Sequence, residues 1–330
     1  MHACRTDDGS MNFIAVLAAL ALEQWRTLRW RVALERAYVR YVRFLEMKLN
    51  GGTPQHGVFG AIAALAPPVL LAGVGFWLLF RVHPVLGLVW NVLWLYFLMG
   101  FRRFSHAYSD VVAALRNNDL HGARRALSAW RGGGTTELGT EEIARLSIER
   151  GLLDSYQQVF ATLFWFTVLP GPTGAVLYRA ASLLASEWRA EVRGEDSTPI
   201  TAAREIFGRP ARTLLWLLDW IPVRLTALSF AIVGDFEDAV YCWRTQARAW
   251  SDQPGGEHAG IVLASGGGAL GVQLGGPLPV LGAEPEFRPE LGMGDAAEGD
   301  LLPSAVGLVW RALVLWLLLI LLLTLANWAP

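Results

Sequence analysis

The segment from Leu214 to Phe236 is apolar enough to enter a lipid bilayer, yet it carries ionisable residues in its interior. Asp219 and Arg224 stand on either side of Pro222. Because an ionisable group at membrane depth is costly, it is tolerated where it faces a partner or a wet cavity. We therefore expect Asp219 and Arg224 to line a ligand site. The alternative is that the segment lies shallow and that Arg224 reaches the lipid headgroups.

The composition also indicates a membrane protein. Hydrophobic residues make up 53% of the chain, the mean hydropathy is +0.35, and tryptophan, a residue typical of membrane interfaces, occurs 15 times. The formal net charge of −1 gives no basic excess that would suggest nucleic-acid binding. His258 is a lone imidazole without a second ligand nearby in the sequence, so no metal site is expected.

Several regions are long and apolar enough, or nearly so, to span the hydrocarbon core, which takes about 20 residues. They cover residues 57–80, 82–100, 159–188, 214–236 and 312–328. The first two predict a transmembrane hairpin over residues 57–100. Leu169-Pro-Gly-Pro-Thr-Gly174 interrupts the third region and Pro222 the fourth, which favours broken or re-entrant helices around a polar site over residues 158–250. The last run predicts a C-terminal transmembrane helix within residues 303–330.

The remaining segments are polar or amphipathic. Residues 1–10 have no periodic pattern, so we interpret them as an extension upstream of a natural start at Met11. Residues 11–56 predict one interfacial amphipathic helix, because basic and aromatic residues alternate along it as on anionic lipid. Nucleic-acid binding is the alternative for that strip. Residues 101–157 predict a helical loop, and residues 251–302 a loop rich in Gly and Pro.

Short polar motifs punctuate these loops. Asn117-Asn118-Asp119 predicts a turn and a helix cap. The glycine run after Arg131, followed by Thr135-Thr136, matches no phosphate-binding loop and favours a flexible linker, with phosphate binding as the alternative. By the positive-inside rule, the arginine-rich loops are cytoplasmic. The sequence thus predicts an all-α, polytopic protein of the inner (cytoplasmic) membrane with broken or re-entrant helices and helical cytoplasmic loops.

A set of motifs resembles the CobD/CbiB superfamily of membrane proteins. These motifs are ALRNNDLHGARRAL at 114–127, GAVLYRA at 174–180, IPVRLTAL at 221–228, ALGVQLGGPL at 269–278 and RPELG at 288–292. The superfamily includes the cobinamide-phosphate synthases of cobalamin assembly and the AmpE-like proteins linked to β-lactamase induction. The resemblance covers residues from about 100 to 295.

Departures from the synthase pattern bear on the function that the resemblance implies. The synthases carry a Glu, then a Glu-Asn pair and an Asp, whereas here Glu149 is followed by Leu153-Asp154 and Gln157. An ATP-consuming condensation needs carboxylates for Mg²⁺. The resemblance therefore favours a non-catalytic AmpE-like role in regulation or sensing. The alternative is a divergent adenosylcobinamide-phosphate synthase, which would use Mg-ATP and a corrinoid.

The candidate ligand-binding residues combine both lines of reasoning, and they are Asp219, Arg224, Glu149, Asp154, Tyr178 and Arg179. Each has a simpler interpretation. Asp219 and Arg224 could pair with each other across Pro222, Glu149 and Asp154 could be solvated on a surface helix, and Tyr178-Arg179 could anchor an interface. The expected partners are the lipid bilayer and either an anionic small molecule or another membrane protein, and no nucleic acid.

Overall fold

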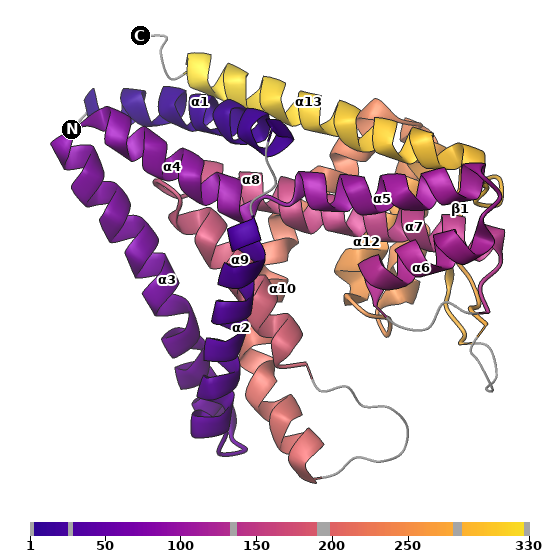
Figure 1. The fold of residues 1–330 in the computed structure, drawn as a ribbon, viewed down its shortest axis with the longest axis horizontal. Coiled ribbons are helices and arrows are strands. Elements are labelled where there is room, and N and C mark those ends of the chain that lie inside the picture. The colour runs from indigo at the N-terminus through magenta and orange to yellow at the C-terminus, as the bar shows by residue number, and fades with distance from the viewer. Residues whose placement is uncertain (1–2, 26–28, 133–136, 190–198, 280–285, 327–330) are drawn as a thin grey trace. The chain divides into compact units, whose positions relative to one another are not determined.

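The computed structural model describes residues 3–25, 29–132, 137–189, 199–279 and 286–326. Its described residues are helical apart from turns, loops and one short strand pair, which confirms the predicted all-α class (Figure 1). Within them, three helices are long and apolar enough to cross a membrane, namely Pro54–Val82, Ala203–Val233 and Gly299–Ala326. The fold is therefore that of an all-α membrane protein.

Contacts divide the chain into two compact units, each built from segments that are distant in sequence. Unit 1 comprises Met1–Met99, Ala161–Asp219 and Leu321–Pro330, and unit 2 comprises Gly100–Phe160 and Trp220–Ile320. The helices of unit 1 are α1 (Ala3–Trp25), α2 (Arg29–Leu49), α3 (Pro54–Val82), α4 (Pro84–Leu98), α8 (Ala161–Val168), α9 (Thr173–Glu187) and the first part of α10 (Pro199–Val233).

Unit 2 contains the remaining elements. They are α5 (Phe101–Arg116), α6 (Leu120–Arg131), α7 (Thr140–Ser155), a π-helical turn (Tyr156–Phe160), the end of α10, α11 (Phe236–Gln246), α12 (Gly256–Leu270), strands β1 (Gln273–Gly275) and β2 (Glu290–Gly292), and most of α13 (Leu302–Ala326). Short 3-10 turns precede α12 and α13, at Ala247–Trp250 and Gly299–Leu301.

The N-terminal region differs from the single interfacial helix that we predicted. It forms two helices, α1 and α2, which run in different directions in Figure 1, and residues 26–28 between them lie outside the described residues. Helix α1 packs against α4, and Ala15, Val16 and Ala19 are buried there. This small-residue stripe explains the difference, because it lets α1 join the core of unit 1.

Helices α3 and α4 meet at His83, where the sequence predicts a hairpin. Pro67 and Pro68 lie inside α3, and because proline has no N–H, each deprives the carbonyl four residues earlier of its helical donor. The Tyr41 hydroxyl donates to the Ala63 carbonyl at 2.8 Å. The Tyr38 hydroxyl approaches the Ala64 carbonyl at 3.5 Å. Aromatic donors from α2 thus replace the bonds that the prolines remove.

Helix α10 corrects a second prediction, since it continues without a break through Pro222. The expected interruption of the segment Leu214 to Phe236 at Pro222 is wrong. Pro222 leaves the Leu218 carbonyl without a helical donor. The indole N–H of Trp165 in α8 donates to that carbonyl at 3.1 Å. The lost backbone bond is therefore replaced from a neighbouring helix, and α10 stays continuous.

The predicted break at residues 169–174 is present, and it separates α8 from α9. A Cβ atom at Gly174 would lie 1.9 Å from the Trp165 carbonyl oxygen. Only glycine lets the start of α9 approach α8 this closely. The two helices therefore form a helix-turn-helix pair within unit 1.

In unit 2, the loop predicted to be helical forms α5, α6 and α7. Asp119 caps α6, its carboxylate accepting from the Gly122 N–H at 2.8 Å, and the turn before it places Asn118 at a φ of 54°. The three helices enclose an apolar core of Val111, Ala123, Leu127, Leu138, Ile143, Leu146 and Leu278. The glycine run and Thr135-Thr136 after Arg131 lie almost wholly outside the described residues.

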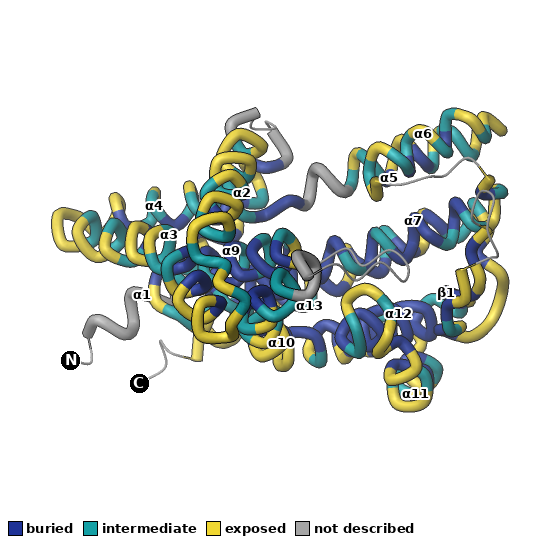
Figure 2. The backbone as a smooth tube through the Cα atoms, turned by 90° about the horizontal axis from the view of Figure 1, so that it is seen from below, coloured by how far each residue is buried: buried dark blue, intermediate teal, exposed yellow. Residues whose placement is uncertain are grey.

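The segment 251–302 was predicted to be mostly loop, and this is wrong for its first part. Residues Gly256–Leu270 form α12, which is almost wholly buried and appears dark blue in Figure 2. A Cβ atom at Gly268 would lie 2.5 Å from the Asp238 carbonyl oxygen of α11. Close packing against α11 explains why glycines that disfavour an isolated helix are found in this one.

Candidate functional site

A buried ion pair joins α7 to the hairpin of β1 and β2 in unit 2. Arg288 donates through Nη1 to Glu149 Oε2 at 3.0 Å and through Nη2 to Glu149 Oε1 at 2.6 Å. The backbone N–H of Gly275 adds a bond to Glu149 Oε1 at 2.8 Å. Glu149 is 5% exposed and Arg288 6%. The bidentate geometry and these three bonds explain how two opposite charges are tolerated away from water.

The hairpin that Glu149 holds is a tight, glycine-rich structure. Its antiparallel register pairs Gln273 with Gly292 and Gly275 with Glu290. A Cβ atom at Gly275, whose φ is +72°, would lie 2.0 Å from the Pro289 carbonyl oxygen. The glycine pattern therefore serves a close approach of two backbone strands.

Asp154 lies one and a half turns after Glu149 on α7 and is also buried and paired. It accepts from the indole N–H of Trp130 at 2.9 Å and pairs with Arg150 at 3.2 Å. The simpler interpretation of Glu149 and Asp154 as solvated surface carboxylates is therefore wrong. In this arrangement both carboxylates hold helices and hairpin together.

Two further guanidinium groups of unit 2 are those of Arg145, which contacts the hairpin, and Arg131, which ends α6. Arg145 donates to the Pro277 carbonyl at 3.0 Å. Arg131 has part of its side chain exposed, and desolvation, followed by the positive charge of Arg288, lowers its pKa. Guanidinium groups beside backbone turns are suited to binding phosphate and carboxylate groups.

The polar residues of the membrane segment are held by separate partners. Asp219 is buried and accepts from the Tyr178 hydroxyl at 2.8 Å. Arg224 lies over the Trp220 ring, 4.3 Å from its centroid, and donates to the Trp220 carbonyl at 2.6 Å. The sequence predicted one site around Asp219 and Arg224, with an ion pair as the simpler alternative. The structure gives the two residues different contacts on the same helix.

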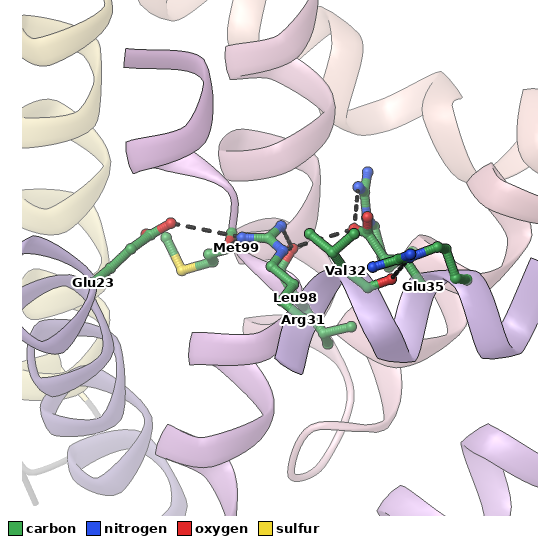
Figure 3. A network of polar contacts seen from close by, with 8 residues as sticks. Glu23, Arg31, Val32, Glu35, Leu98 and Met99 are labelled. Atoms are coloured by element: carbon green, nitrogen blue, oxygen red, sulfur yellow. Dashed lines mark hydrogen bonds and ion pairs between the residues drawn. The ribbon is translucent and has the colours of Figure 1, made fainter. Parts of the chain in front are cut away.

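Tyr178 and Arg179 have different surroundings. Tyr178 is fully buried, so its alternative interpretation as an interface anchor is wrong. Arg179 pairs with Glu35 at 3.1 Å. Figure 3 shows the same network around Arg31, which pairs with Glu35 and Glu23 at 3.7 and 3.8 Å.

Arg31 also ties α2 to the end of α4. Its guanidinium donates to the Leu98 carbonyl at 2.9 Å and to the Met99 carbonyl. These carbonyls belong to the last residue of α4 and to the capping residue after it, and neither has a donor further along that helix. The alternation of basic and aromatic residues predicted over residues 11–56 gives no sign of this capping role.

His258 lies in the first turn of α12, and not in a loop. Desolvation by burial, followed by the charge of Arg224, lowers its pKa. Among the described residues, no group of three or more His, Cys, Asp or Glu could hold a metal ion. Since Glu149 and Asp154 are also engaged by arginines, the residues present do not form a ready Mg²⁺ site.

Arg288 is the residue of this site that the reasoning on ionisable candidates missed. It belongs to the RPELG motif at 288–292, which was used only for the resemblance. One signal in the sequence could have identified it. The motif places an arginine before a proline and a glycine, at some distance from any apolar span. Its carboxylate partner lies 139 positions away, so no local pattern could identify the pair.

Together, these features define the protein as an all-α membrane protein. In its second unit, a buried arginine–glutamate pair holds a glycine-rich hairpin against α7. The chain belongs to the CobD/Cbib protein family, whose model matches residues 13–309.

Named relatives agree with this assignment. The chain is 36% identical to the cobalamin biosynthesis protein CobD of Stutzerimonas stutzeri, over 94% of this chain and 97% of the relative. It is 38% identical to the protein of the same name from Chromobacterium violaceum, over 78% and 76%. The cobalamin biosynthesis protein CbiB of Salmonella typhimurium is 28% identical over 83% and 81%. No solved structure matches the chain.

These relatives overturn the functional interpretation drawn from the missing carboxylates. A non-catalytic, AmpE-like role is wrong, because relatives that match most of the chain carry cobalamin biosynthesis names. The interpretation treated each carboxylate of the pattern as a metal ligand. Glu149, the carboxylate that remains, instead binds Arg288 and the Gly275 N–H. The presence of a carboxylate at a position therefore does not by itself show that this residue binds a metal ion.

Proposed function

We propose that the protein acts in cobalamin biosynthesis as a multi-pass enzyme of the cytoplasmic membrane, an adenosylcobinamide-phosphate synthase. In this reaction the amine of an amino-alcohol phosphate forms an amide with a corrin carboxylate. The observation that carries the proposal is the match to cobalamin biosynthesis protein CobD over 94% of this chain and 97% of the relative.

The reaction requires groups that bind phosphate, and unit 2 contains arginines that could do so. Joining a carboxylate to an amine expels the elements of water, and overall this is coupled to the conversion of ATP to ADP and phosphate, with the phosphate taking up the oxygen that the carboxylate loses. Both co-substrates carry phosphate, for which arginine is well suited. Arg145 binds the Pro277 carbonyl beside the glycine hairpin, and we assign it to phosphate binding. Among the described residues, the carboxylates of this site are paired with arginines and form no Mg²⁺ cluster.

Glu149, Arg288 and Asp154 take a positioning role in this proposal. Their hydrogen bonds fix α7, α6 and the hairpin. The same bonds keep the Gly275 and Gly276 backbone in place beside Arg145. Asp219, Tyr178, Arg179 and Arg224 remain proposed ligand contacts of the membrane segment, with an anionic substrate group as the expected partner.

The proposal is tested by complementation of a host that lacks its own synthase. Expression of this chain should restore cobalamin-dependent growth on exogenous cobyric acid. The variant Arg145→Gln should reduce that growth while the protein accumulates normally in the membrane. Arg248→Gln, at a side chain that is almost fully exposed, serves as the matched control. Failure of the wild-type protein to support growth, when present in the membrane, would contradict the proposal.

A further inference from the structure

A cavity of about 410 Å³ lies between α2, α3, α4 and α9, all within unit 1. Its volume falls in the range of small-molecule sites, about 300–1,000 Å³. Most of its wall is apolar, including Leu71, Trp90, Leu93, Phe97, Val176 and Leu183. Helix α3 is one of the candidate membrane spans. Part of the cavity wall therefore belongs to a helix that acyl chains would surround.

One part of the cavity wall is charged. Arg31, Glu35 and Arg179 all line it, and Glu35 Oε1 lies 3.1 Å from Arg179 Nη2 and 3.7 Å from Arg31 Nε. Figure 3 shows this network at the start of α2. Glu23, which also meets Arg31, does not line the cavity. The lining charges are thus two guanidinium groups and one carboxylate.

Apart from Arg31, whose Nε faces Glu35 Oε1 at 3.7 Å, the lining residues carry two N–H donors with no hydrogen-bond acceptor among the described residues. They are the indole Nε1 of Trp94 and the Nε of Arg179, and both atoms are buried. Buried donors in folded proteins are nearly always hydrogen-bonded. The neighbouring Trp90 follows that rule, because its indole N–H donates to the Ala72 carbonyl at 3.0 Å. The donors of Trp94 and Arg179 therefore suit a bound molecule that carries oxygen acceptors.

We propose that this cavity binds part of one phospholipid molecule from the bilayer, namely one acyl chain and the ester or phosphate group next to it. An acyl chain would pack against the aromatic and aliphatic wall. Phosphate or ester oxygens would accept from Trp94 and Arg179. A phospholipid combines both chemistries, whereas the apolar wall alone would suit any hydrocarbon. This proposal rests on the cavity in unit 1, whereas the enzymatic function proposed above rests on the family match, and Arg179 is the one residue assigned in both.

The test measures lipid retained by the full-length protein. Purified protein is incubated with phosphatidylglycerol vesicles, re-isolated in detergent, and examined by native mass spectrometry. The wild type should retain one phospholipid per chain. Ala37→Phe should abolish retention, because Ala37 lines the cavity and is exposed to it, so a larger side chain fills the space without entering the core. Trp94→Phe removes one hydrogen bond and should lower retention about fivefold.

Trp77→Phe is the matched control, since Trp77 is an exposed tryptophan on α3 that does not line the cavity. It should retain lipid like the wild type. Thermal unfolding shows whether each variant is folded. Equal retention by the wild type and Ala37→Phe would overturn the proposal. So would retention of palmitate, offered in a parallel incubation, without retention of phosphatidylglycerol.

Discussion

At the scale of single residues, the Glu149–Arg288 pair is the feature on which unit 2 depends most. Both charges are almost fully buried and each is satisfied by the other. A buried pair adds little stability compared with a well-packed apolar pair, but removing one partner leaves a buried charge uncompensated. The pair therefore acts as a constraint on where the hairpin can sit.

Glu149→Gln should lower the free energy of unfolding by about 3–5 kcal/mol, because Arg288 loses its counter-charge. A decrease in the midpoint of thermal unfolding in detergent would show this. The double variant Glu149→Leu/Arg288→Met should recover part of the loss, since it buries no charge. Arg43→Gln breaks an exposed pair with Glu187 and should change little. A Glu149→Gln midpoint equal to that of the wild type would contradict this role.

His258 provides a prediction about pH. Its pKa lies below the ordinary value of 6.5 in the folded chain, because of desolvation and then the charge of Arg224. As the pH falls below 6.5, the unfolded state binds the proton before the folded state does. Stability attributable to His258 is thus fully present above 6.5 and is lost as the pH falls through the lowered pKa.

Arg224→Gln should raise the pKa of His258 part of the way back towards 6.5. The return is partial because desolvation is the larger cause. A histidine-resolved NMR titration measures it, with Arg43→Gln as a control, because Arg43 is an exposed arginine of α2 that pairs with Glu187. An unchanged His258 pKa in Arg224→Gln would show that the two groups are not electrostatically coupled.

At the scale of elements, prolines inside two helices leave backbone carbonyls without a helical donor, and aromatic side chains of neighbouring helices supply the missing donors. Pro222 in α10 and Pro67 in α3 each free a carbonyl, which Trp165 or Tyr41 then binds. In a bilayer no water is available for such a carbonyl, so a protein donor is required. The continuity of α10 thus depends on a residue in α8.

Trp165→Phe should therefore destabilise the protein by about 1–3 kcal/mol, because the Leu218 carbonyl loses its donor while the ring packing is largely kept. The midpoint of thermal unfolding in detergent tests this. Trp77→Phe removes an exposed indole and should have almost no effect. If both variants unfolded at the wild-type temperature, the bond from Trp165 would not support α10.

The sequence predicted the elements that neighbouring residues determine. It did not predict the elements whose structure depends on contacts with residues distant in sequence. The break at residues 169–174, the Asp119 cap and the apolar spans follow from neighbouring residues. The continuity of α10 and the helical glycines of α12 depend on Trp165 and α11, which are distant in sequence. The candidate site was predicted only in part, because Glu149 was identified without Arg288.

At the scale of the whole molecule, the chain consists of two units that are each assembled from separate segments. Unit 1 carries α3 and the phospholipid cavity that we propose. Unit 2 carries the buried ion pair and the glycine hairpin. The family match spans residues 13–309 and so includes both. We therefore expect catalysis to require the intact chain.

The central claim is that this chain forms an amide in cobalamin biosynthesis, and formation of the product tests it most directly. Purified protein in bilayer discs would be supplied with adenosylcobyric acid, an amino-alcohol phosphate and Mg-ATP, and the corrinoids analysed by mass spectrometry. The proposed function predicts a product with the mass of adenosylcobinamide phosphate, absent from empty discs. No product from folded protein with all three substrates present would contradict it.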